Sequence, residues 1–440
     1  MTNLAEKASK FPRMSSVACA QILALIVILA IALVLRMLVL DRTNLDLIDH
    51  FLLWLEDMRS NGFWIAISRP YSAYGYTPIY SYAIGLADAL LPAGTDGKTV
   101  IKSVSIFFDF VAAGLVVAIA RLRWGKGWQP VAACAAMLFA PTIFLNGAFW
   151  GQSDIIYTTF LLATIYLLLA KKSDFWAMVC FGLALTIKLQ AAWLGPFILM
   201  MMVRGRIRWW LMILPPIVYI VVALPAVLAG RSLIEVASIY LTQAGTQSGL
   251  NHSVANLMFF PFYFFSHLGW WPEGVPFVAK AAIGFTAAIG LLFAWKASRG
   301  KLNEEALLVA ALVSVLILPQ FLPHMHNRYF FTADVFTIVL AVWRPAYWPA
   351  AVMMQFNSVV TYLSFLWPTM PDYPVPGWLA FVGFTNNLQP VTGLIAFAGI
   401  VNFLLLVWFW RRLRQLQQQQ PADTIGIPVR KQTQSTRLTK

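Results

Sequence analysis

Five short polar segments stand out in a sequence that is otherwise strongly apolar. They carry carboxylate, imidazole, amide, ammonium and guanidinium groups, which are the side chains that exchange protons and bind phosphate. The segments are 45–54 with Asp46, Asp49 and His50, 149–157 with Trp150, Gln152 and Asp154, 186–190 with Lys188 and Gln190, 249–253 with Asn251 and His252, and 323–331 with His324, His326, Asn327, Arg328 and Tyr329.

These residue types suggest phosphate chemistry if they surround one cavity. A carboxylate can take the proton of an attacking hydroxyl group, and arginine can bind a phosphate through two parallel hydrogen bonds. Simpler explanations exist: Asp46 could solvate a loop, Trp150 could anchor the chain at a membrane surface, and Lys188 could extend its ammonium group to water. His324 and His326 could satisfy backbone groups or bind a divalent metal, although no third ligand is evident.

The composition places these segments in a membrane protein. Hydrophobic residues make up 60% of the 440 residues and charged residues 11%, whereas soluble domains carry about a quarter charged residues. The net charge of +14 comes from short clusters between apolar runs, which favours a role in membrane orientation over nucleic-acid binding. The three cysteines lie inside apolar runs, so we expect no disulfide framework.

The apolar runs predict an all-α polytopic membrane unit over residues 17–410. We place twelve spans at 17–40, 99–120, 128–148, 155–170, 173–187, 190–203, 208–229, 274–296, 304–322, 330–343, 346–366 and 389–410. Several are shorter than the roughly 20 residues that cross a bilayer, so we expect tilted, broken or partly re-entrant helices there. Residues 1–16 form a cytosolic segment, and residues 411–440 form a basic, disordered cytosolic tail.

The distribution of positive charge predicts the orientation of these spans in the membrane, independently of their hydropathy. With the N-terminus inside, most of the 32 lysines and arginines lie on the inner side, as expected for cytosolic loops. Both termini are then cytosolic, and the long loops 41–98, 230–273 and 367–388 are outer, with interfacial helices expected in the first. All five polar segments and all five histidines fall on this outer side. The short loops favour a bacterial inner membrane with a periplasmic site, and an endoplasmic reticulum protein would have a similar pattern.

In this order, the segments resemble the GT-C superfamily of membrane glycosyltransferases, in particular bacterial relatives of the second mannosyltransferase of GPI-anchor assembly. The resemblance covers roughly residues 40–335. One departure is Asn327, which stands where the family pattern has glutamate. The matching residues are Asp46 eight positions before Trp54, Tyr76-Thr-Pro-Ile-Tyr80, Trp150-Gly-Gln-Ser-Asp154, Lys188 and Gln190 before Pro196, and Pro323 through Tyr329.

The resemblance implies a transferase that takes a sugar, commonly mannose, from a polyprenyl-phosphate donor on the outer face. Asp46 would be the general base, and inversion at the anomeric carbon would follow. The donor phosphate would be bound by Arg328, Lys188, His326 and His324. The sugar or acceptor would be positioned by Asp154, Gln152, Trp150, Asp49, Gln190, Tyr329, Asn251 and His252. The resemblance leaves open the acceptor (a glycan, lipid or protein), a divalent metal and the oligomeric state.

Other functions remain open at this point. A transporter or flippase of lipid-linked sugars would place ionisable residues in the middle of the membrane, and Asp109 within the second span fits this alternative. A buried aspartate that is hydrogen-bonded to neighbouring helices fits the same residue equally well. A ligase or polymerase that moves a whole lipid-linked glycan, or a non-catalytic lipid-binding subunit, would carry a similar pattern.

Overall fold

A computed structural model describes residues 15–70, 76–246, 251–252, 254–261, 264, 275–366 and 392–419. These residues are mainly helical, and each predicted span coincides with a straight or broken helix. The helices concerned are α2 (Ser16–Met37), α6 (Gly97–Trp124), α7 (Gln129–Leu138), α9 (Asp154–Leu169), α10 (Asp174–Ile187), α11 (Gly195–Val203), α12 (Leu214–Leu228), α15 (Val275–Ala297), α16 (Glu304–Phe321), α17 (Phe331–Trp343), α18 (Trp348–Leu366) and α20 (Thr392–Gln418).

The protein is a multi-pass membrane protein, but the predicted count of twelve spans is not confirmed. Within the described residues, six helical stretches are long and apolar enough to cross a membrane: α2, α6, α12 with the preceding turn η4 (Trp209–Ile213), α15, α16 and α20. The segment 129–149 would be a seventh, with a bend of 46° between α7 and the helical stretch from Pro141. Helices α9, α10 and α17 have 16, 14 and 13 residues and pack inside the bundle.

Capping side chains explain where several of these helices begin. The Ser15 hydroxyl accepts a hydrogen bond from the backbone N–H of Ala18 at the start of α2. The Asn303 side chain accepts one from Ala306 at the start of α16, where the acidic residues Glu304 and Glu305 also occupy the first turn. Both arrangements satisfy N–H groups that a helix leaves unpaired at its N-terminus.

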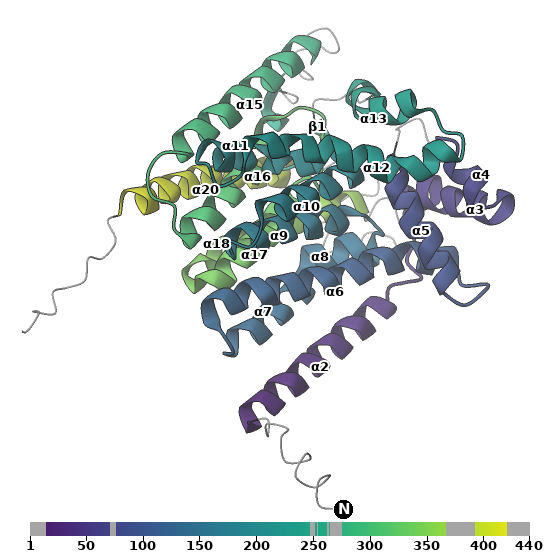
Figure 1. The fold of residues 1–440 in the computed structure, drawn as a ribbon, viewed down its shortest axis with the longest axis horizontal. Coiled ribbons are helices and arrows are strands. Elements are labelled where there is room, and N and C mark those ends of the chain that lie inside the picture. Colours follow the sequence, from purple (N-terminus) through teal and green to yellow (C-terminus); the bar gives the residue numbers. More distant parts are fainter. Residues whose placement is uncertain are drawn as a thin grey trace, which may run out of the picture.

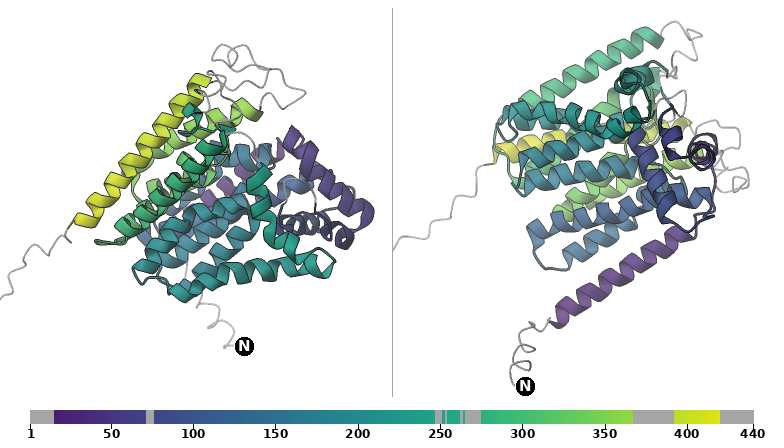
Figure 2. Two further views of the ribbon diagram at one scale, coloured as in Figure 1. Left: turned by 90° about the horizontal axis from the view of Figure 1, so that it is seen from above. Right: turned by 45° about the vertical axis from the view of Figure 1, so that its right-hand side comes forward.

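Different parts of the chain lie at the two ends of the helical bundle. In Figure 1 the start of α2 and the end of α20 lie on the left, whereas the helices of the first long loop, α3 (Leu52–Asn61), α4 (Phe63–Ile67) and α5 (Pro78–Leu90), lie on the right with α13 (Leu233–Thr246). Helix α2 stands at the lower edge in Figure 1 and in the right view of Figure 2. The helices predicted in loop 41–98 are therefore present, and loop 367–388 lies outside the described residues.

The end of α20 corrects the predicted boundary of the tail. The helix continues to Gln418, so residues 411–418 are helical instead of disordered. Contacts with the turn after α15 hold this extension. The Gln417 side-chain amide donates to the Ala297 carbonyl at 2.7 Å, and the Gln417 carbonyl accepts from the Lys301 backbone N–H at 3.2 Å.

Candidate active site

Asp46 lies at the rim of a large cavity and is held by two neighbouring side chains. It directly precedes the π-helical turn η1 (Leu47–Phe51). Its Oδ2 atom accepts hydrogen bonds from the Trp150 indole N–H at 3.0 Å and the Gln152 amide at 2.9 Å. No donor from the described residues bonds to Oδ1. One carboxylate oxygen is thus fixed by the protein, and the other is available to a substrate.

The segment that carries Trp150 and Gln152 is shaped by a second π-helical turn, η2 (Leu145–Phe149). Gly151 follows with φ of +84°, and a Cβ atom there would lie 3.3 Å from Leu47 Cδ1. Glycine is suited to this position because it adopts positive φ without steric cost and allows the two segments to approach. Such π-turns frequently occur at functional sites.

Side-chain to backbone hydrogen bonds join this segment to its neighbours. The Asn44 amide donates to the Trp150 carbonyl at 2.9 Å, and the Ser105 hydroxyl of α6 donates to the Gln152 carbonyl at 2.6 Å. Asn44 also accepts from the Leu47 backbone N–H at 3.1 Å. Asp46 and its two hydrogen-bond donors are therefore fixed relative to one another by buried contacts.

Arg328 lies between the two carboxylates of the site. Its Nη1 is 3.5 Å from Asp46 Oδ2, its Nε is 3.5 Å from Asp154 Oδ2, and its guanidinium carbon is 5.2 Å from the centre of the Trp150 ring. These separations exceed the 2.7–2.9 Å of a strong charge-assisted hydrogen bond. The Nε–H is also buried without a hydrogen-bond partner among the described residues. Burial would lower the pKa of Arg328, but Asp46 and Asp154 outweigh it and raise that pKa, so the cation persists with donors to spare.

Asp154 and Lys188 form the inner part of the same charge network. Asp154 begins α9, is 1% exposed, and accepts from Lys188 Nζ at 2.8 Å and from the Asn146 amide at 2.9 Å. Burial lowers the pKa of Lys188, and the charge of Asp154 opposes this effect. Asp46, Arg328, Asp154 and Lys188 thus alternate in sign.

The cavity beside this network has a volume of about 720 Å³ and two unlike walls. Its size lies within the range of small-molecule binding sites. The polar wall includes Asp46, His50, Gln152, Gln190, His324, His326, Arg328 and Tyr329, and the apolar wall includes Ile283, Leu318 and Leu322. Phe365 lines the cavity on the polar side, where its ring stacks on Trp150 with centroids 5.1 Å apart. A smaller pocket adjoins it and is lined by Tyr76, Lys188, Gln190, Arg328 and Tyr329.

The central part of the sequence matches the model of a known protein family. The model of glycosyltransferase family 87 matches residues 74–319, which is more than half of the sequence. The chain belongs to glycosyltransferase family 87. The match does not test the specific relationship to the second mannosyltransferase of GPI-anchor assembly.

A solved structure shares the fold of this family 87 protein. It is the crystal structure of ArnT from Cupriavidus metallidurans bound to undecaprenyl phosphate, with a TM-score of 0.51 and 13% sequence identity. The match covers 88% of this chain and 77% of ArnT. At this identity the likeness concerns the fold, which is the GT-C architecture expected from the sequence. No curated protein shows significant sequence similarity to the chain.

Of the remaining predicted residues of the family 87 protein, some lie in or next to the loop that lines the cavity, and one lies away from it. Strand β2 (Met325–His326) pairs in parallel with β1 (Asn251–His252), so the fourth and fifth polar segments are adjacent. His324 has a φ of +59°, and the His326 ring contacts Tyr329 with centroids 5.3 Å apart. Asp49, in contrast, is exposed and does not line the cavity. His267 lies outside the described residues.

Three predicted positions have different surroundings from those expected. Trp150 and Asp154 are fully buried and line neither pocket, so they contact Asp46 and the two cations instead of the cavity. Asn327 is 3% exposed, and its backbone carbonyl accepts from the Thr361 hydroxyl of α18 at 2.9 Å. The departure from the family glutamate therefore falls on a residue packed against a helix.

Two buried cations outside the five polar segments, Lys102 and Arg36, hold helices and backbone of the bundle in place. Lys102 of α6 is fully buried, and its ammonium group donates to the Val39 and Arg42 carbonyls at 2.8 Å each, which fixes the chain just before Asp46. Arg36 of α2 pairs with Asp109 at 2.8 Å, with both side chains 0% exposed. A charged residue within an apolar span is unusual, and that signal was available at both cations.

The Arg36–Asp109 pair also bears on the transporter alternative. Arg36 donates further hydrogen bonds to the Ala32 and Leu138 carbonyls at 3.1 Å each. Asp109 therefore has a fixed partner and joins α2, α6 and α7. Among the described residues, no three histidine, cysteine, aspartate or glutamate side chains group as metal ligands.

Proposed function

We propose that this family 87 glycosyltransferase moves a sugar, most simply mannose, from a polyprenyl-phosphate donor to an acceptor hydroxyl group, with inversion. The observation that carries the proposal is that Asp46 and Arg328 share the rim of one cavity, 3.5 Å apart. One can deprotonate an acceptor while the other binds a phosphate. The site would face the periplasm, or the lumen in a eukaryote, with both termini in the cytosol.

The reaction would proceed by one displacement. Asp46 Oδ1 takes the proton of the acceptor hydroxyl, and the acceptor oxygen forms a bond to the anomeric carbon. The bond from that carbon to the phosphate oxygen breaks, and the lipid phosphate leaves with the electron pair and one additional negative charge. Attack opposite the leaving group inverts the anomeric configuration.

Arg328 would stabilise the charge that develops on the departing phosphate. Its guanidinium donors are only loosely engaged by Asp46 and Asp154, so they can turn to a ligand without breaking a strong ion pair. Stabilisation of charge in the transition state is usually the largest catalytic contribution. Lys188, held by Asp154, would add positive charge from the smaller pocket. His324 and His326 would bind the phosphate from the loop that also carries Arg328.

The shape of the cavity supports a lipid-linked donor. Leu318 and Leu322 at the end of α16 and Ile283 on α15 form its apolar wall, and Ile283 is 49% exposed on a helix apolar enough to span a membrane. A polyprenyl chain could therefore lie along this wall while its phosphate reaches Arg328. The ArnT structure that shares the fold is bound to undecaprenyl phosphate. Gln190 and Tyr329 line the cavity and would contact the sugar or acceptor. Asn251 and His252, on the strand that pairs with Met325–His326, would do the same.

The proposal is tested by incubating the full-length protein in nanodiscs with radiolabelled polyprenyl-phosphate mannose and candidate glycan, lipid and protein acceptors. We expect label to move to an acceptor in an amount that increases with protein, whereas GDP-mannose supplied alone gives none. Polyprenyl-phosphate glucose in a parallel reaction tests the choice of sugar. Consumption of the nucleotide sugar without the lipid donor, or transfer of an intact lipid-linked glycan only, would contradict the proposal.

A further inference from the structure

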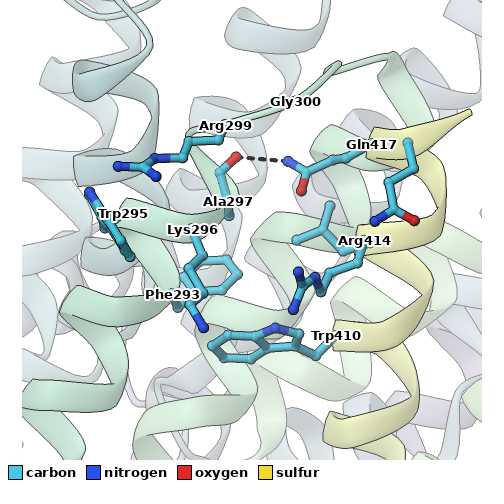
Figure 3. Close-up of a pocket in the computed structure, with 11 residues that line it drawn as sticks. Phe293, Trp295, Lys296, Ala297, Arg299, Gly300, Trp410, Arg414 and Gln417 are labelled. Carbon is cyan, nitrogen blue, oxygen red and sulfur yellow. Dashed lines mark hydrogen bonds between the residues drawn. The ribbon is translucent and has the colours of Figure 1, made fainter. Parts of the chain in front are cut away.

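A second cavity lies far from Asp46, where the ends of α15 and α20 meet the turn before α16 (Figure 3). It has a volume of about 340 Å³. Helix α16 starts beside this turn and ends at the apolar wall of the first cavity, and its 18 residues separate the two sites by about 27 Å. The second cavity is therefore a distinct site on the basic side of the protein.

The polar groups that line this second cavity are mostly cationic. Lys296, Arg299 and Arg414 all line it, and Figure 3 shows Lys296 and Arg414 extending toward the Trp410 ring. In the described part of the chain, no carboxylate lies within ion-pair distance of these cations. Glu305, which follows the same turn, is already bound by Arg344 at 2.9 Å and Arg412 at 3.0 Å.

The backbone carbonyls of the turn are covered, so they would not repel an anion. Arg204 donates to the Ser298 and Gly300 carbonyls at 2.7 and 2.9 Å. Gln417 donates to the Ala297 carbonyl at 2.7 Å, as the dashed line in Figure 3 marks. The cavity therefore combines hydrogen-bonded backbone acceptors with cations that have no carboxylate partner among the described residues, and Arg299 stacks on the Trp295 ring at 3.9 Å. Cations arranged in this way can bind a phosphate group.

The position of the cavity identifies the source of that phosphate. Trp295 lines it near the end of α15, and Trp410 lines it where the apolar part of α20 ends before Arg411. Tryptophan at the ends of apolar segments marks the level of lipid headgroups. Residues 420–440 contain one acidic residue, Asp423, against four basic residues, so the tail of this chain does not complement the cavity. We infer that the cavity binds the phosphate of an anionic phospholipid headgroup and that this lipid bridges α15 and α20.

This inference is independent of the sugar-transfer chemistry and is tested by lipid binding. The full chain is placed in phosphatidylcholine nanodiscs with or without phosphatidylglycerol, and lipid retention is measured by native mass spectrometry together with the melting temperature. The test variant is Lys296→Gln with Arg414→Gln. Each cation at a membrane surface raises the affinity for an anionic lipid about fivefold, so loss of both should lower the affinity for phosphatidylglycerol about 25-fold.

The matched control is Arg121→Gln with Arg206→Gln, which removes two exposed cations that do not line the cavity, one in the last turn of α6 and one in the turn after α11. It should retain the lipid, as should the charge-conserving variant Lys296→Arg with Arg414→Lys. Equal loss of affinity in the test and control variants would overturn the inference, because it would show a general surface-charge effect. Equal stabilisation by inorganic phosphate in phosphatidylcholine nanodiscs would overturn the assignment to a lipid.

Discussion

Asp46→Asn should lower the rate of sugar transfer between about 10²- and 10⁴-fold, the range for loss of a general base. Asparagine can still accept the hydrogen bonds that Trp150 and Gln152 donate to Oδ2, so the side chain should keep its position. It cannot take the proton of the acceptor hydroxyl. The measurement is the initial rate of label transfer from radiolabelled polyprenyl-phosphate mannose in nanodiscs.

The neighbouring aspartate provides the control for Asp46→Asn. Asp49 is in the same loop, three residues further on, but it is exposed and does not line the cavity. Asp49→Asn should therefore transfer sugar at close to the wild-type rate. A wild-type rate for Asp46→Asn at normal protein level would show that another group activates the acceptor, and an equal loss in both variants would point to a general effect of loop charge.

Asp109→Ala should destabilise the protein by about 3–5 kcal/mol, because it leaves the Arg36 guanidinium buried without its partner. Both side chains are 0% exposed and 2.8 Å apart, so the guanidinium has no bulk solvent beside it in the folded protein. The expected readout is a large fall in the temperature at which half of the purified protein remains monodisperse after heating. A transporter would instead lose solute uptake in this variant while keeping its stability.

Two further variants separate this effect from simple loss of charge. Asp88→Ala breaks the exposed Arg59–Asp88 pair, whose side chains are 38% and 26% exposed, and should cost at most about 1 kcal/mol. The double variant Arg36→Met with Asp109→Leu removes both buried charges and should recover much of the lost stability. If Asp109→Ala melts like Asp88→Ala, the buried pair does not stabilise the bundle.

The convergence of the polar segments could be predicted from sequence because membrane topology restricts the alternatives. Once apolar runs and cation clusters fix the loops, segments far apart in the chain must emerge on the same side. Asp46, Gln152, Lys188 and Arg328 do meet in the structure. The side of the membrane that they face is still a prediction.

The direction of each side chain could not be predicted in this way. Trp150 and Asp154 were assigned to the substrate, yet they are buried and contact Asp46 and Lys188 instead. The two π-helical turns shift the register beside Asp46 and Trp150, and a motif in sequence does not reveal such a shift. The partners of Lys102 are backbone carbonyls, which no residue pattern marks, so its position within an apolar span is the one signal that the sequence offers for it.

The number of membrane spans could not be predicted from the lengths of the short apolar helices. Helix α17 has 13 residues, all buried, so other helices surround it and its length need not match the bilayer. The helical continuation of α20 depends on contacts of Gln417 with a distant turn, which local composition does not contain. The span count and the end of α20 therefore depend on contacts between helices, which a hydropathy pattern does not contain.

In the proposed reaction Asp46 activates the acceptor while Arg328 binds the donor phosphate, and the affinity of the purified protein for polyprenyl phosphate tests this division of roles most directly. Asp46→Asn should bind at least as tightly as the wild type, because it removes a negative charge 3.5 Å from Arg328, although its rate of sugar transfer is strongly lowered. Arg328→Ala should bind about 10- to 100-fold more weakly, because it loses charge-assisted hydrogen bonds to the phosphate. Wild-type binding by Arg328→Ala, or equal weakening in both variants, would contradict this division of roles.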